Sequence, residues 1–277
     1  MSVLADPAAV SPLVRARWAA GDALLVARRN LTHVRHVPEK LIDVTLQPLM
    51  FVALFAYVFG NAIHVPGGDY REYLMAGIFV QTLAFGVMGT AVGMAEDITK
   101  GVVDRFRSLP MARSAVLAGR TLADMAASVL ALVVLTATGL LVGWTVHASA
   151  ASVAGGFALL LLFAYAMTWV GVLLGVVVRG GEAAQGVVFV VMFPLTFLAN
   201  TFVATRDLPA ALRAFAEWNP LSAVVAAVRD LWGNPSGVTG DVAWPLAHAL
   251  PVALGWCVAI LLVTVPLAVR GYRRAGR

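Results

Sequence analysis

Charge is scarce in this sequence. Asp, Glu, Lys and Arg together make up 13% of the 277 residues, whereas 60% are hydrophobic, and the mean hydropathy is +0.85. An average soluble domain carries about 25% charged residues. The low charge therefore excludes an ordinary soluble protein and indicates a chain that is surrounded by lipid or by other apolar helices.

Motifs for several kinds of chemistry are also absent. The two lysines, Lys40 and Lys100, lie outside any Gly-x-x-x-x-Gly-Lys-Ser/Thr loop, so the sequence has no such site for the phosphates of ATP. The five histidines form no His-Glu-x-x-His pattern and have no cysteine at zinc-ligand spacing, and no Gly-x-Ser-x-Gly occurs. Cys257 is the single cysteine, so no internal disulfide forms. We expect no catalytic residues, no metal site and no bound cofactor.

Long apolar stretches dominate what is present. Six of them are each long enough to cross about 30 Å of hydrocarbon as a helix that rises 1.5 Å per residue. We therefore expect an all-α integral membrane protein with six transmembrane helices in one membrane domain, residues 41–277, after a tail of residues 1–40. The predicted spans are residues 41–63, 73–95, 125–146, 153–178, 183–205 and 246–269.

The placement of Lys and Arg predicts the orientation, because basic loops are retained in the cytoplasm. Six spans put both termini on one side, and that side carries sixteen of the twenty basic residues. We expect a multi-pass protein of the cell membrane with both termini cytoplasmic. This bias, together with attraction to anionic lipid, accounts for the net charge of +5 without nucleic-acid binding. The other side has Arg71, Arg206, Arg213 and Arg229.

The centres of the predicted spans contain no Asp, Glu, Lys or Arg. Proton- and sodium-coupled transporters usually place ionisable groups there, so the sequence disfavours an ion-driven carrier.

Two segments on the predicted cytoplasmic side have helical periodicity. In the tail, Val14, Trp18, Gly21 and Leu25 form an apolar stripe, which predicts an interfacial helix or, alternatively, a simple basic anchor. After the second span, apolar residues recur at helical spacing with Arg105 on a polar flank and a Pro stop. This pattern favours a short helix whose apolar ridge fits a groove on a partner, although a solvated connector with chance periodicity is the alternative. The ridge consists of Val102, Val103, Phe106 and Leu109.

Two spans carry aromatic, Met and amide side chains on one face. Such a stripe has two interpretations: it lines a path for an amphipathic substrate, or it is ordinary helix packing. Small residues also recur at i and i+4, which lets helix backbones approach closely. The stripes are Gln81, Phe85 and Met88 in the second span and Phe189, Phe193, Phe197 and Asn200 in the fifth; the small pairs are Gly89 with Gly93, Gly139 with Gly143, and Gly171 with Gly175.

The last external connection, residues 206–245, is long for a loop without a function of its own. After Asn219 and Pro220, apolar residues form one helical face, with Arg229 and Asp230 off that face. We expect a helix that dips into or rests on the outer leaflet, where it either closes a pathway or caps the bundle.

Three segments of the sequence resemble a known family. They are residues 101–111, residues 193–203, and the run from Leu208-Pro209 through Glu217-Trp218-Asn219-Pro220-Leu221 to Arg229. These segments are similar to the membrane subunits of type-2 ABC exporters, especially the daunorubicin-resistance permeases of actinobacteria. The resemblance covers nearly the whole chain and departs from the family pattern at Ala204 and at Ala210-Ala211.

The resemblance implies a homodimer of this chain bound to two copies of a separate ATP-binding cassette subunit, which binds ATP and Mg. It makes residues 41–277 an ABC type-2 transmembrane domain and residues 102–109 a coupling helix, with Val102, Val103, Arg105, Phe106 and Leu109 at the contact. It also implies an amphipathic substrate, such as a drug, a glycolipid or a lipid-linked glycan. Asn219, Pro220 and Arg229 would form an external gate. A non-transporting membrane scaffold or assembly protein is the alternative function.

Overall fold

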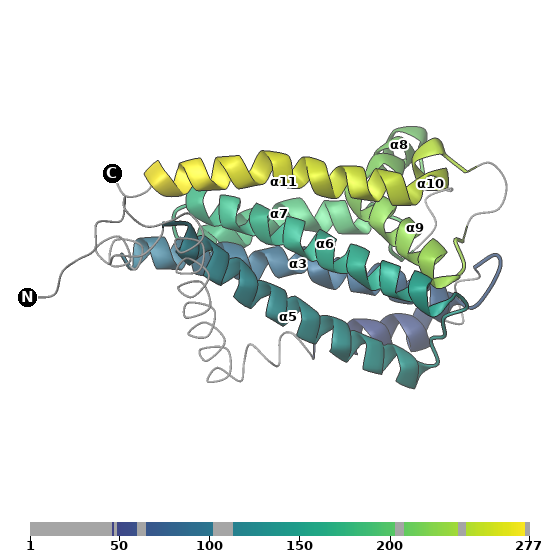
Figure 1. Cartoon of the computed structure of the whole chain (residues 1–277). Coiled ribbons are helices and arrows are strands. Elements are labelled where there is room, and N and C mark those ends of the chain that lie inside the picture. Colours follow the sequence, from purple (N-terminus) through teal and green to yellow (C-terminus); the bar gives the residue numbers. More distant parts are fainter. Residues whose placement is uncertain are drawn as a thin grey trace, which may run out of the picture.

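The computed structural model describes residues 46, 49–59, 65–101, 113–202, 208–237 and 242–274. Five helices run side by side and alternate in direction (Figure 1). In hydrocarbon each backbone N–H and C=O needs a partner within the protein, and a helix provides it locally. The five are α3 (Tyr70–Thr99), α5 (Arg113–Val142), α6 (Ala150–Val177), α7 (Gly181–Phe197) and α11 (Ala249–Arg274).

Four of these helices are long and apolar enough to cross a membrane: α3, α6, α11 and the part of α5 from Gly119 to Val142. Two shorter apolar helices, Leu49–Val58 and α7, accompany them, and the first overlaps a π-helical segment, η1 (Leu54–Phe59). The prediction of a helical, multi-pass membrane protein is therefore confirmed. The count of six spans stays a prediction.

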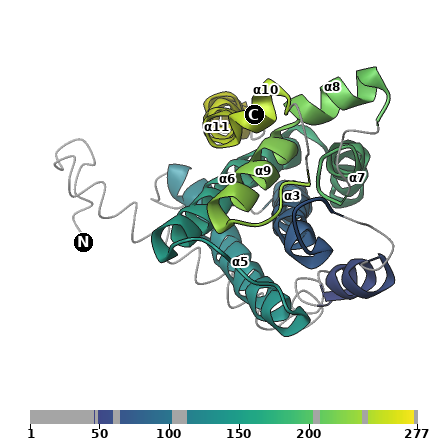
Figure 2. The ribbon, with the colours of Figure 1, turned by 90° about the vertical axis from the view of Figure 1, so that its right-hand side faces the viewer.

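Helix α3 forms the centre of the bundle and packs against α5, α6, α7 and α9 (Figure 2). Of its most apolar 18-residue window 67% is buried inside the chain, against 22% for α11. Leu74, Ile78, Phe79 and Val80 are fully buried. Helix α3 is thus held mainly by protein, whereas α11 presents most of its surface to the surroundings.

Glycines allow α6 to lie close to α3. A Cβ atom on Gly171 would lie 2.7 Å from the Cβ of Thr90, and one on Gly175 would lie 2.5 Å from the carbonyl oxygen of Ala91. Both distances are too short for a real side chain, so glycine is required at this helix contact. The predicted close approach at Gly171 and Gly175 is confirmed.

The predicted third span, residues 125–146, is wrong at both ends. Helix α5 begins at Arg113, so Arg120 lies on it rather than in a loop, and it ends at Val142. A hydropathy pattern detects only the apolar part of a helix, and a helix extends into the polar interface when charged side chains find partners there. At the other end Gly143 adopts φ 92°, a left-handed conformation that stops the helix.

The predicted fifth span, residues 183–205, is also too long. Helix α7 ends at Phe197, one turn after Pro194, and residues 198–202 continue as turns and bends. This non-helical segment is nevertheless inside the bundle, because Ala199, Asn200 and Thr201 are each no more than 5% exposed.

Three shorter helices lie at one end of the bundle: α8 (Ala210–Trp218), α9 (Pro220–Trp232) and α10 (Trp244–Ala247) (Figure 1). Helix α8 is on the surface, with only Ala216 buried. Helix α9 instead packs against α3, α6 and α11, and nine of its thirteen residues are buried. Small residues such as Ala223 and Ala227 extend its apolar surface around the helix, so α9 is inserted among the other helices rather than resting on a surface. That it dips into the outer leaflet stays a prediction.

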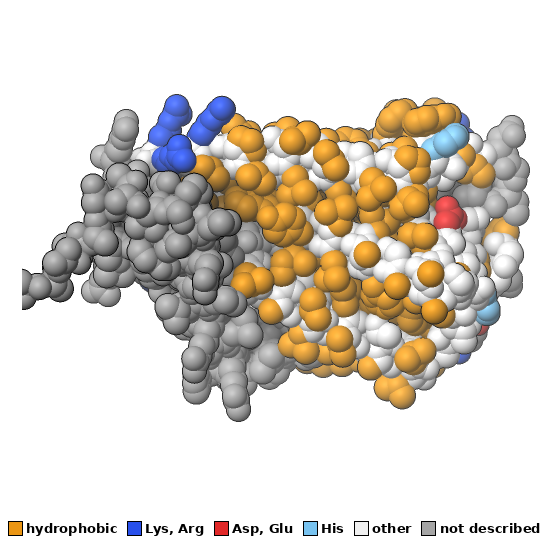
Figure 3. Space-filling model, viewed as in Figure 1, with side chains coloured by type: hydrophobic (Ala, Val, Ile, Leu, Met, Phe, Trp, Pro, Cys, Tyr) orange, Lys and Arg blue, Asp and Glu red, His pale blue; other side chains and the backbone are white. Residues whose placement is uncertain are grey.

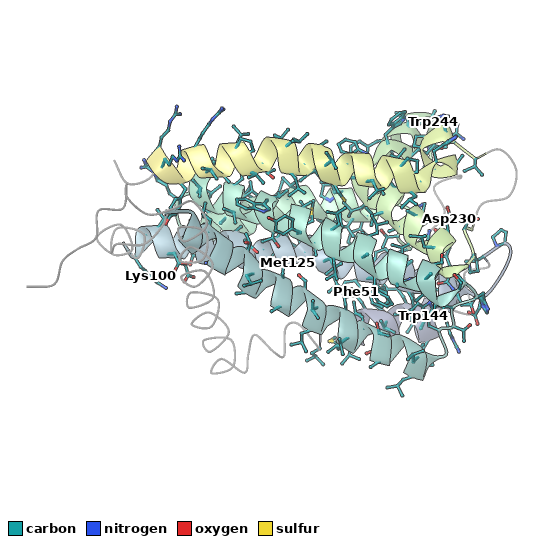
Figure 4. The ribbon with its side chains drawn as sticks, in the orientation of Figure 1. Phe51, Lys100, Met125, Trp144, Asp230 and Trp244 are labelled. Carbon is teal, nitrogen blue, oxygen red and sulfur yellow. The ribbon has the colours of Figure 1, made fainter. Side chains whose placement is uncertain are left out.

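The surface is divided along the bundle axis (Figure 3). Hydrophobic side chains cover the middle, Lys and Arg gather where α11 ends in Arg273 and Arg274, and His and acidic side chains appear at the opposite end. Lys100 and Trp244 mark these two ends in Figure 4. The predicted orientation, in which the end with Lys100 faces the cytoplasm, stays a prediction.

Candidate functional site

A buried arginine joins three elements near the end of the bundle that carries α8 to α10. Arg229 on α9 is 1% exposed, and its guanidinium carbon lies 3.4 Å from the ring centroid of Tyr73 on α3. Its Nε donates to the carbonyl of Tyr73 at 3.0 Å, and Nη2 donates to the carbonyls of Asn200 at 2.9 Å and Thr201 at 3.2 Å. Although Arg229 stands off the apolar stripe of α9 in the sequence, it is buried and not exposed.

The burial of Arg229 follows from what it binds. An isolated cation in an apolar interior is costly, and its side chain is usually paired or directed to backbone carbonyls. Here three carbonyl oxygens and the face of an aromatic ring supply negative partial charge. The carbonyls of Asn200 and Thr201 follow the C-terminus of α7, where the helix dipole favours a cation.

Two tyrosine hydroxyls add hydrogen bonds around Arg229. We call the contacts of Arg229, Tyr70 and Tyr73 with residues 200–202 the Arg229 junction. Tyr73 donates to the carbonyl of Asn200 at 3.1 Å, Tyr70 donates to the carbonyl of Phe202 at 3.3 Å, and the backbone N–H of Asn200 donates to Oγ of Ser222 at 3.1 Å. Non-helical backbone at membrane depth is tolerated only where the protein satisfies its polar groups. Residues 198–202 remain unwound because α3 and α9 provide those partners.

A glycine makes room for the unwound segment. A Cβ atom on Gly77 of α3 would lie 2.2 Å from the carbonyl oxygen of Thr201. The backbone after α7 therefore lies directly against α3, with no space for a side chain between them.

Asn219 fixes the start of α9. Its Oδ1 accepts the N–H of Leu221 at 2.9 Å, and its Nδ2 donates to the carbonyl of Leu195 in α7 at 2.7 Å. Pro220 follows as the first residue of the helix, where its missing N–H leaves no bond unmade. The structure thus brings one predicted gate residue, Arg229, together with the predicted pathway residue Asn200, whereas Asn219 binds α7 separately through Leu195.

The predicted stripe on the fifth span separates into two parts. Phe189, Phe193 and Phe197 are 50%, 44% and 46% exposed, with ring centroids 5.4 Å and 4.4 Å apart. The aromatic contacts continue from Phe197 to Phe202 at 5.7 Å. Asn200 is 5% exposed and lies beyond the helix, so it does not share the face of the three phenylalanines.

The stripe on α3 is mostly enclosed within the chain. Gln81 is 6% exposed, and Phe85 and Met88 are partly buried against the main core. Helix packing describes these three side chains better than an open path does.

Four aromatic rings fill the bundle next to the Arg229 junction. Trp232 at the end of α9 has its ring centroid 5.1 Å from Phe79, 5.0 Å from Trp144 and 5.2 Å from Phe157. The indole N–H of Trp232 donates to the carbonyl of Val153 at 3.3 Å. This aromatic cluster and the Arg229 junction together lock α9 into the bundle.

The predicted coupling residues, Val102, Val103, Arg105, Phe106 and Leu109, lie outside the described residues, as does the predicted interfacial helix of the tail. Their neighbours are described: α3 ends at Thr99 and α5 begins at Arg113, at the end of the bundle opposite to α8 (Figure 1). In the described part of the chain, no three His, Cys, Asp or Glu side chains are grouped to hold a metal ion.

Sequence reasoning missed the partners of Arg229. Tyr70 and Tyr73 lie one turn apart in the first turns of α3, near the expected outer surface. The available signal was Arg229 itself, because a lone cation in an apolar helix requires partners elsewhere in the bundle. Sequence reasoning also missed that Arg120 on α5 forms ion pairs with Asp97 on α3 and with Asp124 on its own helix.

Comparison with known proteins gives this architecture a family. The model of the family described as ABC-2 type transporter matches residues 23–231 of the chain. This chain belongs to the ABC-2 type transporter family. The resemblance noted in the sequence is therefore confirmed, and the helical bundle described above is that of an ABC permease.

The relatives of this ABC-2 chain include permeases that are named for drug resistance. The daunorubicin resistance ABC transporter permease protein DrrB1 of Streptomyces coeruleorubidus is 33% identical over 88% of this chain and 83% of its own length. The doxorubicin resistance ABC transporter permease protein DrrB of Mycobacterium tuberculosis is 23% identical over 89% of this chain and 87% of its own length. The putative transport permease ycf38 of Porphyra purpurea is 23% identical over 76% of this chain and 73% of its own length.

Proposed function

We propose that this chain is the membrane-spanning subunit of an ATP-driven exporter that moves an amphipathic molecule out of the cell. The observation that carries the proposal is the family match over residues 23–231, together with relatives named as drug-resistance ABC permeases. The sequence has no phosphate-binding loop of its own. The energy therefore comes from a separate ATP-binding subunit.

Two copies of the chain form the working unit, bound to two copies of the ATP-binding subunit at the cytoplasmic face. Six spans with both termini inside place residues 102–109 on that face. The apolar ridge of Val102, Val103, Phe106 and Leu109, with Arg105 beside it, docks into the partner. Burying such a ridge in a groove is a common way for a short helix to bind.

The substrate path lies between the two copies and is lined in part by Phe189, Phe193 and Phe197. This choice is supported by their exposure, since a nearly continuous row of aromatic rings remains uncovered within the single chain. Aromatic faces stack well on planar or amphipathic ligands. A drug, a glycolipid or a lipid-linked glycan provides such a surface.

The Arg229 junction acts as the external gate. Arg229 binds α9 to α3 and to the carbonyl of Asn200 after α7, and Asn219 binds α9 to the carbonyl of Leu195 in α7. In this conformation the outer end of the bundle is closed by α9 and by the aromatic cluster. When the outer end of the bundle opens, the hydrogen bonds of Arg229 break or are replaced by others.

Co-purification with a candidate ATP-binding subunit tests the proposal. We expect a complex with two copies of each chain, whose ATP hydrolysis depends on the permease. Phe106→Asp puts a charge on the docking ridge and should abolish the stimulation of ATP hydrolysis without affecting insertion, while the flanking Ser108→Asp serves as the matched control. Failure of any ATP-binding subunit to associate would support the scaffold function instead.

A further inference from the structure

A charged cluster joins α3 to α5 at the end of the bundle where Lys100 lies. Nη1 of Arg120 on α5 lies 2.8 Å from Oδ2 of Asp97 on α3, and its Nε lies 3.8 Å from Oδ2 of Asp124. The same oxygen of Asp124 accepts a hydrogen bond from Oγ1 of Thr90 on α3 at 2.9 Å. Each helix therefore contributes a carboxylate, and Arg120 lies between the two.

This cluster differs from two more exposed ion pairs of the described residues. Lys100 with Glu96 and Arg213 with Glu217 are i,i+4 pairs, whereas Arg120 with Asp97 joins two helices. The Arg120 side chain is only 14% exposed. Partial burial weakens screening by water and salt, so the interaction holds the helices more firmly than an exposed pair would.

A glycine provides the space for Arg120. A Cβ atom on Gly93 of α3 would lie 2.0 Å from Nη2 of Arg120, so any other residue would displace the guanidinium. Nη2 also donates to the carbonyl of Gly89 at 3.4 Å, but a Cβ on Gly89 would meet nothing within 4 Å. The two glycines of the pair Gly89 and Gly93 therefore differ in their surroundings, and only at Gly93 does the missing side chain leave space for the guanidinium of Arg120.

The position of the cluster relates it to the predicted coupling segment. Asp97 is in the last turn of α3 and Arg120 is in the second or third turn of α5, so the cluster bridges the two helices that flank residues 102–112. Beyond it, residues 125–142 of α5 carry no charge and span about 27 Å at 1.5 Å per residue. The cluster therefore lies at one edge of the hydrocarbon region.

We propose that Asp97, Arg120 and Asp124 form a clamp that makes α3 and α5 move together when the partner ATPase displaces the segment between them. The inference rests on the proposed function and adds to it a set of positioning residues outside the docking contact. Without the clamp, displacement of the segment would be absorbed by sliding of α5 past α3. With it, the same displacement moves α3, the central helix, and hence the Tyr70 and Tyr73 end that binds Arg229.

The test compares export with ATP hydrolysis in proteoliposomes that hold the complete complex, with daunorubicin as the probe. We expect Arg120→Gln and Asp97→Asn each to lower the amount exported per ATP hydrolysed about fivefold, and the double variant to be no worse than either single one. Arg120→Lys should recover part of the loss. The surface pair provides the control, so Arg213→Gln should leave the ratio unchanged.

The two glycines supply a second comparison that leaves every charge in place. Gly93→Ala should lower the ratio as Arg120→Gln does, whereas Gly89→Ala should not. An unchanged ratio in Asp97→Asn and Gly93→Ala complexes that still hydrolyse ATP would overturn the clamp. A wild-type complex that exports nothing in response to ATP would instead overturn the proposed function.

Discussion

Arg229 shows how a single residue connects parts of the chain that are far apart in sequence. Its guanidinium binds the carbonyls of Tyr73, Asn200 and Thr201. Without it the carbonyl of Thr201 would lose its bond to Nη2, whereas the carbonyl of Asn200 would keep the hydroxyl of Tyr73 as a donor. A buried acceptor without a partner costs about 1–3 kcal/mol. The junction therefore stabilises the fold, besides the gating role proposed for it.

Replacement of this arginine should destabilise the protein. We expect Arg229→Met to lower the free energy of unfolding by about 3 kcal/mol, because the carbonyls of Asn200 and Thr201 lose their cation. Arg229→Lys should be intermediate, since an ammonium lacks the planar fork that reaches several acceptors. Thermal unfolding in detergent measures the effect, with the half-exposed Arg213→Met as the control. Equal unfolding temperatures for the two methionine variants would contradict the role of Arg229.

The exposed phenylalanines of α7 allow a test of the substrate path. Phe193→Ala should reduce export of an aromatic drug about three- to tenfold, because a lost aromatic contact costs about 0.5–1.5 kcal/mol. Stability should change little, since Phe193 is 44% exposed. Leu262→Ala on α11 removes an apolar side chain that is 70% exposed and serves as the control. A similar loss of export in both variants would argue against a path along α7.

At the scale of elements, the contact between α6 and α3 depends on missing side chains. Gly175→Ala should lower the unfolding temperature, because its Cβ would lie 2.5 Å from the carbonyl oxygen of Ala91, and a backbone atom cannot move aside cheaply. Gly255→Ala on α11 is the matched control, since its Cβ meets nothing within 4 Å. There alanine should be neutral or slightly stabilising by its helix propensity. If Gly175→Ala were as stable as Gly255→Ala, the helices would not be in such close contact.

The type and order of the long helices could be predicted from the sequence, but their ends could not. Hydropathy identifies residues that prefer lipid, and it located α3, α6 and α11 well. It placed the start of α5 too late, because Arg120 and Asp124 gain partners on α3 that no local pattern reveals. It placed the end of α7 too late, because residues 198–202 are apolar enough for a span yet bind Tyr73 and Arg229 through their backbone.

The candidate site was predicted in parts rather than as a whole. Asn200, Asn219 and Arg229 were each selected from the sequence, but for two separate regions. The contact between Arg229 and Asn200 depends on the depth at which α9 enters the bundle, and this depth is a property of tertiary packing. Helical periodicity alone showed an apolar stripe on α9 and could not show that its opposite side is covered as well.

For the whole molecule, the division of charge predicts one orientation in the membrane. In a Cys257→Ala background, a cysteine at Arg274, which is exposed at the end of α11, should react only with reagents that reach the cytoplasm. A cysteine at Ala211, exposed on α8, should react with an impermeant reagent added outside intact cells. Labelling of both positions from the same side would contradict the arrangement of spans.

The dependence of export on a second polypeptide is the central claim for the whole assembly. The most direct measurement is ATP-dependent accumulation of daunorubicin in inside-out vesicles that contain this chain together with its ATP-binding subunit. We predict accumulation with ATP, and none when the ATP-binding subunit is omitted or carries an inactivated nucleotide site. Accumulation against a gradient by this chain alone would contradict the account.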